Sequence, residues 1–181
     1  MMANCKSCSA PLNADTNICL YCGVRNDVDL HDKFDYSIKN SCSGHICPRC
    51  SIALQAIDLT INVHFYIERC SECFGLFFAP GELEVLLDNA VSAKEAINLK
   101  HIQNINNDYF QFAKVTYIKC PVCRILMNRI NFGYHSGVVT DQCRKHGIWL
   151  DSGEITHLIE WKKAGGQLLA LKKAMIGFDV Q

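Results

Sequence analysis

The sequence lacks any apolar segment long enough to cross a bilayer, and neither sign of charge predominates. No run of 18 consecutive apolar residues occurs, so we expect no transmembrane helix. Residues 1–6 contain no apolar run, so we expect no signal peptide. Lysine plus arginine equal aspartate plus glutamate at 18 each, which excludes a global electrostatic attraction to nucleic acid. The H-E-x-x-H signature of zinc proteases is also absent.

Cysteine, by contrast, is abundant, at 12 of the 181 residues. Ten of these cysteines form five C-x-x-C pairs, and the other two, Cys42 and Cys143, each begin a C-x-x-H. Closely paired cysteines in a chain without an export signal indicate metal ligands in a reducing compartment rather than disulfides. We therefore expect a cytoplasmic metalloprotein.

The cysteine pairs are spaced as three ligand quartets. Two residues between ligands allow a tight knuckle that turns both side chains toward one ion, and spacers of ten or nineteen residues allow a hairpin that returns a second knuckle. Four thiolates, or three thiolates and one imidazole, are typical ligands of tetrahedral zinc, and their pairing disfavours a redox role. We predict three structural zinc ions, bound by Cys5, Cys8, Cys19 and Cys22; by Cys47, Cys50, Cys70 and Cys73; and by Cys120, Cys123, Cys143 and His146.

The second and third quartets are copies of one pattern. A shift of 73 residues maps the second quartet onto the third. After the last ligand, a shift of 72 maps Phe77 onto Trp149 and Glu82 onto Glu154. Agreement at so many positions indicates an internal duplication.

The duplicated pattern resembles a known family. A C-P-x-C pair, a hairpin, a C-x-x-C/H pair and then Gly-x-aromatic-hydrophobic-x-x-Gly-Glu is similar to the transcription-factor-IIB-type zinc ribbon of small bacterial domains. Residues 120–154 match best, and residues 47–82 match less closely because Ala79 stands where the pattern has Asp. Residues 5–23 resemble the short zinc ribbon that precedes many bacterial regulatory and membrane proteins. The resemblance implies a bacterial protein with structural zinc and a presumed link to transcription.

We predict a small metal-stabilised α+β fold of three zinc ribbons, each a β-hairpin or a three-stranded antiparallel sheet. Strands are expected at 53–61 and 64–68 in one repeat and at 125–130 and 138–141 in the other, with a short helix after each ribbon. Ser92-Ala-Lys-Glu95 is a capping box that predicts a bridging helix. The expected divisions are an N-terminal ribbon at 1–24, a linker at 25–41, the first repeat at 42–91, the bridging helix at 92–114, the second repeat at 115–163, and a short helix or tail at 164–181.

The stretch from Cys143 to Glu154 holds a thiol, an imidazole and two carboxylates, so it also admits an enzymatic interpretation. In a zinc-dependent hydrolase, Asp151 and Glu154 would act as acid and base; a zinc-handling protein is a further alternative. The structural interpretation is favoured, with Asp151 as helix N-cap and Glu154 at the third helical position. His146 stands where the other repeat has Cys73, which indicates a ligand. We therefore expect no catalysis.

One more C-x-x-H, formed by Cys42 and His45, stands just before the second quartet. A free cysteine near the edge of a ribbon is favoured over a metal ligand, and both alternatives remain open.

Recognition is the function that these considerations favour. Residues 41–91 contain 2 basic and 6 acidic residues, whereas residues 114–163 contain 8 basic and 4 acidic ones. The acidic excess of residues 41–91 favours a protein partner, and the basic excess of residues 114–163 leaves nucleic acid as an alternative partner. Aromatic and basic groups on an exposed β-ribbon can stack on bases or grip a peptide. The candidate recognition residues are Phe132, Tyr134 and His135, on a hairpin expected to project from the third zinc site, with Arg124, Arg129, Arg144 and Lys145.

Overall fold

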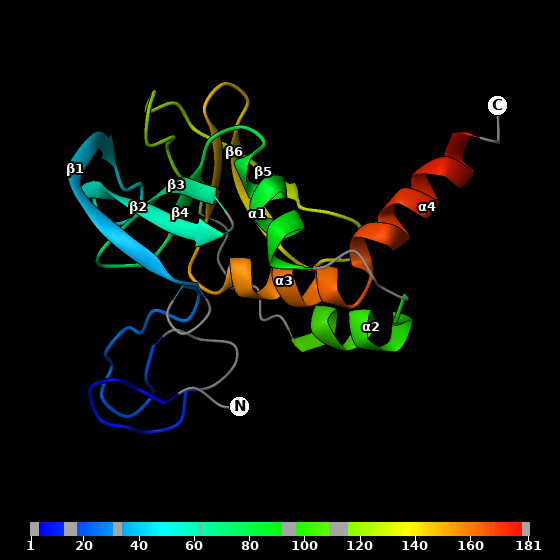
Figure 1. Ribbon diagram of the computed structural model, residues 1–181, viewed down its shortest axis with the longest axis horizontal. Coiled ribbons are helices and arrows are strands. Elements are labelled where there is room, and N and C mark those ends of the chain that lie inside the picture. Colours follow the sequence, from blue (N-terminus) through cyan, green and yellow to red (C-terminus); the bar gives the residue numbers. More distant parts are fainter. Residues whose placement is uncertain are drawn as a thin grey trace.

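A computed structural model describes residues 4–12, 18–30, 34–61, 63–91, 97–108 and 116–178. Over these residues the chain forms one antiparallel sheet, flanking helices and a separate N-terminal lobe (Figure 1). The elements are β1 (Tyr36–Ile46), β2 (Ala53–Ile61), β3 (Val63–Arg69), β4 (Leu76–Phe78), α1 (Glu82–Ala90), α2 (Leu99–Asp108), β5 (Asn128–Asn131), β6 (Val139–Cys143), β7 (Gly147–Leu150), α3 (Glu154–Lys163) and α4 (Gly166–Phe178).

The two repeats join edge to edge in a seven-stranded sheet of order β1-β2-β3-β4-β7-β6-β5. Strands β2 to β4 form the first ribbon and β5 to β7 the second, which confirms the predicted α+β zinc-ribbon fold. In the second ribbon, β5 begins at Asn128 rather than at the predicted Ile125. The residues before it are taken up by the knuckle, which closes with a bridge between Lys119 and Leu126.

A local two-fold axis relates the two ribbons. Strands β4 and β7 pair antiparallel, with Leu76 opposite Leu150, Phe77 opposite Trp149 and Phe78 opposite Ile148. A shift of 72 residues maps this set of pairs onto itself, so the equivalent residues Phe77 and Trp149 face each other across the axis. The joint between the ribbons is therefore formed by two equivalent strands, one from each repeat.

The alternation of side chains along β4 and β7 divides the core between the two faces of the sheet. Leu76 and Phe78 on β4 lie on the face that α1 and α3 cover, in one cluster with the buried leucines and isoleucines of those helices. Phe77 and Trp149 lie on the opposite face, in a second cluster with cysteines of both repeats. The helix faces predicted from sequence are the buried ones, with Leu83, Leu86, Leu87, Ile155, Leu158 and Ile159.

Close contact at the joint requires glycine at two equivalent positions. A Cβ on Gly147, whose φ is +124°, would lie 1.9 Å from the backbone oxygen of Phe78. A Cβ on Gly75 would lie 2.2 Å from the ring of Trp149. Each ribbon thus has a glycine where the other ribbon presses against it.

The expected linker at 25–41 is wrong over much of its length. Tyr36 to Ile46 form β1, which pairs with β2 and widens the first ribbon by one strand. Before it, the segment from Asn26 to Leu30 lies against the sheet, with Leu30 fully buried in the helix-side core. Part of the mixed charge that suggested a linker is paired with the sheet, Asp27 with Arg69 and Lys39 with Asp58.

The predicted bridging helix is shorter than expected. Ile97 and Asn98 are not helical, and α2 starts at Leu99, where the Asn98 side chain accepts a hydrogen bond from the backbone N–H of His101 at 3.0 Å. The capping box at 92–95 lies outside the described residues, as does Phe112, toward which the helix was expected to run.

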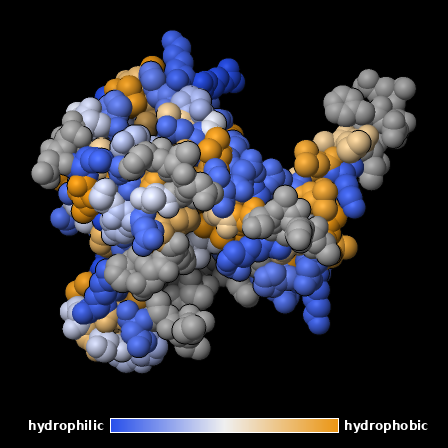
Figure 2. All heavy atoms as spheres, in the orientation of Figure 1, coloured by the Kyte–Doolittle hydropathy of each residue, from blue (hydrophilic) through white to orange (hydrophobic). Residues whose placement is uncertain are grey.

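The last helix, α4, begins at Gly166, within the predicted C-terminal helix or tail, and extends away from the body of the molecule (Figure 1). Apolar side chains are visible along this protruding segment in Figure 2, and Leu171 and Met175 are 58% and 71% exposed. None of the helices among the described residues combines the length and apolar character needed to span a membrane.

Candidate metal centres

Three clusters of thiols and one imidazole coincide with the three predicted quartets. Each cluster offers four ligand atoms that all lie within 4.8 Å of one another. The third cluster uses Nδ1 of His146, at 3.4 Å from Sγ of Cys143 and 3.7 Å from Sγ of Cys120. The members are Cys5, Cys8, Cys19 and Cys22; Cys47, Cys50, Cys70 and Cys73; and Cys120, Cys123, Cys143 and His146.

The spacing of the ligand atoms fits zinc. A Zn–S bond of about 2.3 Å makes the edge of a regular tetrahedron about 3.8 Å long. The Sγ–Sγ separations are 3.5 Å for Cys8 and Cys19, 3.7 Å for Cys47 and Cys73, and 3.9 Å for Cys123 and Cys143, all close to that edge. The three clusters therefore fit three zinc ions.

Backbone N–H groups point at the thiols and favour their ionised form. In the second cluster Sγ of Cys47 accepts from the N–H of Arg49 at 3.4 Å and of Cys50 at 3.3 Å. In the first cluster hydrogen bonds from the backbone of Cys8, acting against burial, lower the pKa of Cys5 to about 6. Only the thiolate binds zinc, so the backbone N–H groups of the knuckle turns favour the form of cysteine that binds the metal.

The second and third centres lie on one face of the sheet, in a single cluster. Their cysteines pack around Leu54 and Met127, with Phe77 and Trp149 between the two ribbons. The first centre stands apart in a small cluster of its own, with Leu12 and, partly buried, Ala10 and Val28. Two of its ligands, Cys8 and Cys22, are exposed.

A segment from Asn26 to Leu30, here called the strap, connects the first centre to the sheet. Asn26 is 4% exposed; its amide donates to Sγ of Cys5 at 3.7 Å, and its side-chain oxygen accepts from the N–H of Lys6 at 3.0 Å. The next residue, Asp27, forms a buried ion pair with Arg69 of β3. A mixed-charge sequence thus makes specific contacts in place of a free linker.

The strap also supplies the cap of α3, which the sequence assigned to Asp151. Asp29 is 1% exposed, and its carboxylate accepts from the backbone N–H of Gly153 at 2.6 Å and of Thr156 at 3.2 Å. The Thr156 hydroxyl donates to it as well, at 2.8 Å. Two of the orphan N–H groups of the helix end are therefore satisfied by a residue more than 120 positions away in the sequence.

The carboxylate of Asp151 binds elsewhere, so its assignment as N-cap is wrong. It accepts from Nε1 of Trp149 at 2.9 Å and from Nε of Arg49, in the other ribbon, at 3.0 Å. Glu154 is the first residue of α3 rather than the third, but it accepts from the backbone N–H of Asp151 at 2.8 Å, as the Glu of a capping box does. Glu82 repeats this contact on Ala79 at 2.7 Å, so both ribbons enter their helices in the same way.

The extra C-x-x-H has no role as a metal ligand among the described side chains. Nδ1 of His45 is 2.9 Å from the carboxylate of Glu68 and does not belong to any of the three clusters. The side chain of Cys42 lies outside the described residues.

The candidate recognition residues fall into two groups at opposite ends of the second ribbon. The hairpin does not project freely, because its turn packs on the helices. The carbonyl of Tyr134 accepts from Nε1 of Trp161 at 3.1 Å, and a Cβ on Gly133 would meet the same indole at 2.6 Å. Phe132 is partly buried against the helix-side core, and His135 packs edge-on against Tyr134.

The basic candidates differ among themselves in exposure. Arg129 is half-buried opposite Asp141 in the β5–β6 pair. Burial and the nearby Asp151 raise the pKa of Asp141 to about 6. Arg124, Arg144 and Lys145 are exposed at the knuckle end, beside the third metal centre.

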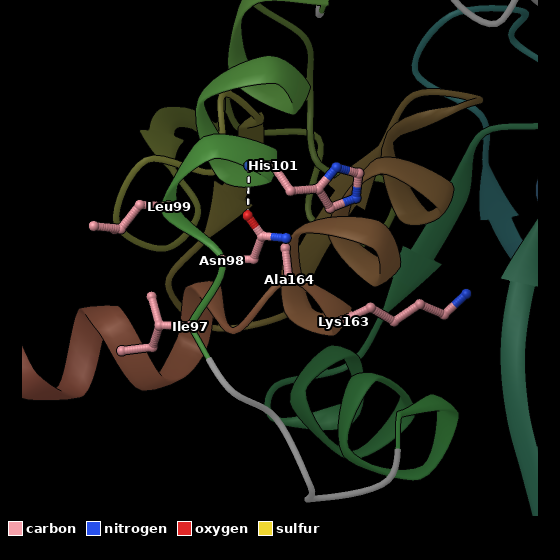
Figure 3. A pocket seen from close by; sticks show the side chains of 6 residues that line it. All are labelled: Ile97, Asn98, Leu99, His101, Lys163 and Ala164. Atoms are coloured by element: carbon pink, nitrogen blue, oxygen red, sulfur yellow. Dashed lines mark hydrogen bonds between the residues drawn. The ribbon is translucent and has the colours of Figure 1, made fainter.

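A shallow pocket lies away from the metal centres, between the start of α2 and the end of α3 (Figure 3). His101 and Lys163 are the polar side chains with titratable groups on its wall. It brings together no further ligand or carboxylate among the described residues, so it adds no chemistry to the three centres.

The comparison with known families bears on the two ribbons of the sheet. Residues 46–89 and 119–161 each match the sequence model of the transcription-factor zinc-finger family, the TFIIB-type zinc ribbon. Both repeats are therefore similar to this zinc-ribbon family over the matched residues. The resemblance inferred from sequence is thereby confirmed for the tandem pair. No curated protein and no solved structure matches the chain.

Sequence reasoning missed the residues that assemble the zinc ribbons into one body. Arg49 had a usable signal, because the repeat alignment places a basic residue where the other copy has Val122. The strap had none, since Asn26, Asp27 and Asp29 act through partners far away in the sequence.

Proposed function

We propose that this zinc-binding protein is a recognition module without catalytic activity, whose three ions hold its binding surfaces in place. The observation that carries this is the completeness of the clusters: each brings four ligand atoms together. A catalytic zinc needs a position open to water or substrate, and four protein ligands fill a tetrahedral ion.

The carboxylates near the third centre support the same conclusion. A hydrolase would need Asp151 or Glu154 free to move a proton. Asp151 is engaged by Trp149 and Arg49, and Glu154 is 8% exposed and bonded to the backbone. These contacts position the ribbon joint and the helix start, which is a structural role.

A zinc-handling role is the second candidate, and one observation favours it. Cys8 and Cys22 of the first centre are exposed, whereas the second centre has no exposed ligand. An ion held by exposed thiolates exchanges more easily with solvent, so this role would be carried by the first centre alone.

We favour a protein partner over nucleic acid, and a cytoplasmic location. The formal charge is balanced, so no global field draws the chain to phosphate backbones. Eleven thiols in metal clusters need a reducing compartment to remain free of disulfides. The second ribbon carries the exposed Arg124, Arg144 and Lys145 and is the part of the sheet that we assign to recognition.

The test is the coordination of the bound metal. Metal analysis of the purified chain should give three zinc per chain, and X-ray absorption should average to eleven sulfur and one nitrogen ligand over three ions. An oxygen ligand at any centre, together with hydrolysis of a model ester or peptide, would contradict the proposal. Rapid loss of one zinc to a weak chelator, with the sheet intact, would favour zinc handling.

A further inference from the structure

The second ribbon exposes a group of large apolar side chains next to its metal centre. Tyr117 is 62% exposed, Val122 36%, Ile125 68% and Leu126 61%. We call these four residues the knuckle patch. Single exposed apolar residues are ordinary on protein surfaces, but four within ten positions around one turn are an unusual local concentration.

The backbone of the knuckle brings Tyr117 and Leu126 onto one face, with Val122 and Ile125 in the turn between them. The N–H of Cys120 donates to the carbonyl of Ile125 at 2.8 Å, and Lys119 lies opposite Leu126 in a bridge. Opposed residues share one face, and Tyr117 is two positions before Lys119, the period of an extended chain. The patch therefore surrounds the tight turn that carries Cys120 and Cys123.

The first ribbon shows that the fold does not need this patch. The shift of 73 residues maps Tyr117 to Gly44 and Leu126 to Ala53, both small. Val122 maps to Arg49, which is used in the contact with Asp151. The remaining equivalent, Ile52, is partly buried in the cluster around the metal centres. The same knuckle thus forms without exposed large apolar groups, so folding does not explain them.

Exposed basic residues lie in the same knuckle as the patch and in the adjoining one, and we call them the basic rim. Lys119, Arg124, Arg144 and Lys145 are exposed, and none forms an ion pair with another described residue. The second knuckle, which carries Arg144 and Lys145, is adjacent because Cys123 and Cys143 lie 3.9 Å apart in one cluster.

The acidic residues of the second ribbon and its helix are occupied elsewhere. Asp141 is buried, and Asp151 contacts Arg49. Glu154 is buried at the start of α3, and Glu160 pairs with Lys163. No carboxylate of this repeat neutralises the rim in the described structure, so the rim carries a local positive charge.

We propose that the knuckle patch and its basic rim form a docking site for a segment of a partner protein that is rich in Asp or Glu and carries large apolar side chains. This inference rests on the proposed recognition function and gives it a location and a ligand class. Apolar groups of the segment would pack on the patch, and its carboxylates would face the rim. Three of the four patch residues are aliphatic, which favours a peptide over the stacked bases of a single-stranded nucleic acid.

The test uses the zinc-loaded full chain as bait for a displayed library of random 16-residue peptides. Labelled synthetic copies of the enriched peptides are then titrated by fluorescence anisotropy. Enrichment of acidic peptides with Leu, Phe or Trp is the expected result. In I125S and L126S, binding should weaken about tenfold or more, since truncated anchor residues at interface centres have effects of this size. The double substitution R144E/K145E should weaken binding and reduce its salt dependence.

Matched controls separate the patch from the fold. A53S changes the equivalent position in the first ribbon and should leave peptide affinity unchanged. Zinc content and thermal melting of I125S should equal those of the unsubstituted chain, because Ile125 is largely exposed.

Two outcomes would overturn the inference. Peptides without acidic and apolar character, or binding insensitive to both I125S and L126S, would refute the docking site while leaving zinc-dependent recognition intact. Tighter patch-dependent binding of a labelled poly-U or poly-dT oligonucleotide would replace the peptide with nucleic acid. Peptide binding that survives complete removal of zinc would instead refute the proposed function itself.

Discussion

The two ribbons of the sheet use one pattern of ligands and turns but present different surfaces. The first ribbon covers its outer edge with β1 and directs Arg49 to Asp151 of its neighbour. The second ends at the short strand β5 and leaves Tyr117, Ile125 and Leu126 exposed. Duplicated zinc ribbons can therefore present different surfaces. The knuckles maintain the fold, so the residues around the ligands are free to diverge.

The largest expected effect comes from removing a ligand of the sheet. In C47S or C120S we expect both ribbons to unfold together, because the two centres share one cluster around Trp149. Structural zinc contributes about 10–16 kcal/mol to folding, which exceeds or equals the whole stability of a small domain. Near-ultraviolet circular dichroism of the tryptophans reports the loss. The matched variant C19S should spare that signal, because the first centre packs separately. A C47S protein with a native second ribbon would show that the two are independent.

Substitution of a glycine at the joint between the ribbons should cost more stability than substitution of a glycine that has open space around it. For G147A we expect a loss of about 3 kcal/mol or more in unfolding free energy, because the added Cβ would meet the Phe78 carbonyl and φ is positive. For the control G44A, which has open space but φ of +77°, about 1–2 kcal/mol is expected. Denaturant unfolding with saturating zinc measures both. Equal losses would mean that contact between the ribbons contributes little.

The cap of α3 distinguishes the two ribbon helices, because Asp29 accepts from Gly153 and Thr156 whereas no described side chain plays this part at the start of α1. In D29A we expect a loss of about 1–2 kcal/mol, because the N–H groups of Gly153 and Thr156 lose their acceptor. D29N keeps an acceptor and should lose less. Thermal melting followed at the tryptophans measures the change, and an unchanged midpoint in D29A would refute the capping role.

The smallest effect on stability is expected for Arg49 and Asp151, which form a contact between the ribbons that is not repeated on the other side of the two-fold axis. R49V gives the first ribbon the residue that the second has at the equivalent position. The ion pair with Asp151 is about one-third exposed on each side, so its loss should cost about 0–1 kcal/mol. A double-mutant cycle with D151A, the change to the first ribbon's alanine, isolates the pairwise energy. D151A alone should cost more, because Trp149 loses its acceptor too.

Local patterns in the sequence were enough to predict the metal ligands, the duplication and the ribbon strands. Those features depend on residues close in sequence: the C-x-x-C turns, the alternation along β2 and β3, and the apolar faces of α1 and α3. The relation between the ribbons was not predictable, because an edge-to-edge pairing of Phe77 with Trp149 leaves no periodic signal.

The strap and the knuckle patch escaped prediction for different reasons. Asp29 is a residue type that is common in loops, and only the fold brings it to the start of α3. The strand β1 was missed because Asn40, Ser41 and Gly44 interrupt any alternation. Leu126 fell within a predicted strand and Tyr117 was not singled out, and the exposure of both follows from which face of the knuckle turns outward.

The pairing of β4 with β7 also determines how many partners one molecule can hold. A symmetric pair of identical chains offers every surface away from its axis twice, so a partner that recognises such a surface can bind in two copies. Joining both halves in one polypeptide removes that constraint, because a residue can change on one side of the axis alone. Gly44 and Ala53 on one side and Tyr117 and Leu126 on the other show such a change. A chain built in this way presents a single copy of its surface, and its complexes should form at one partner per chain.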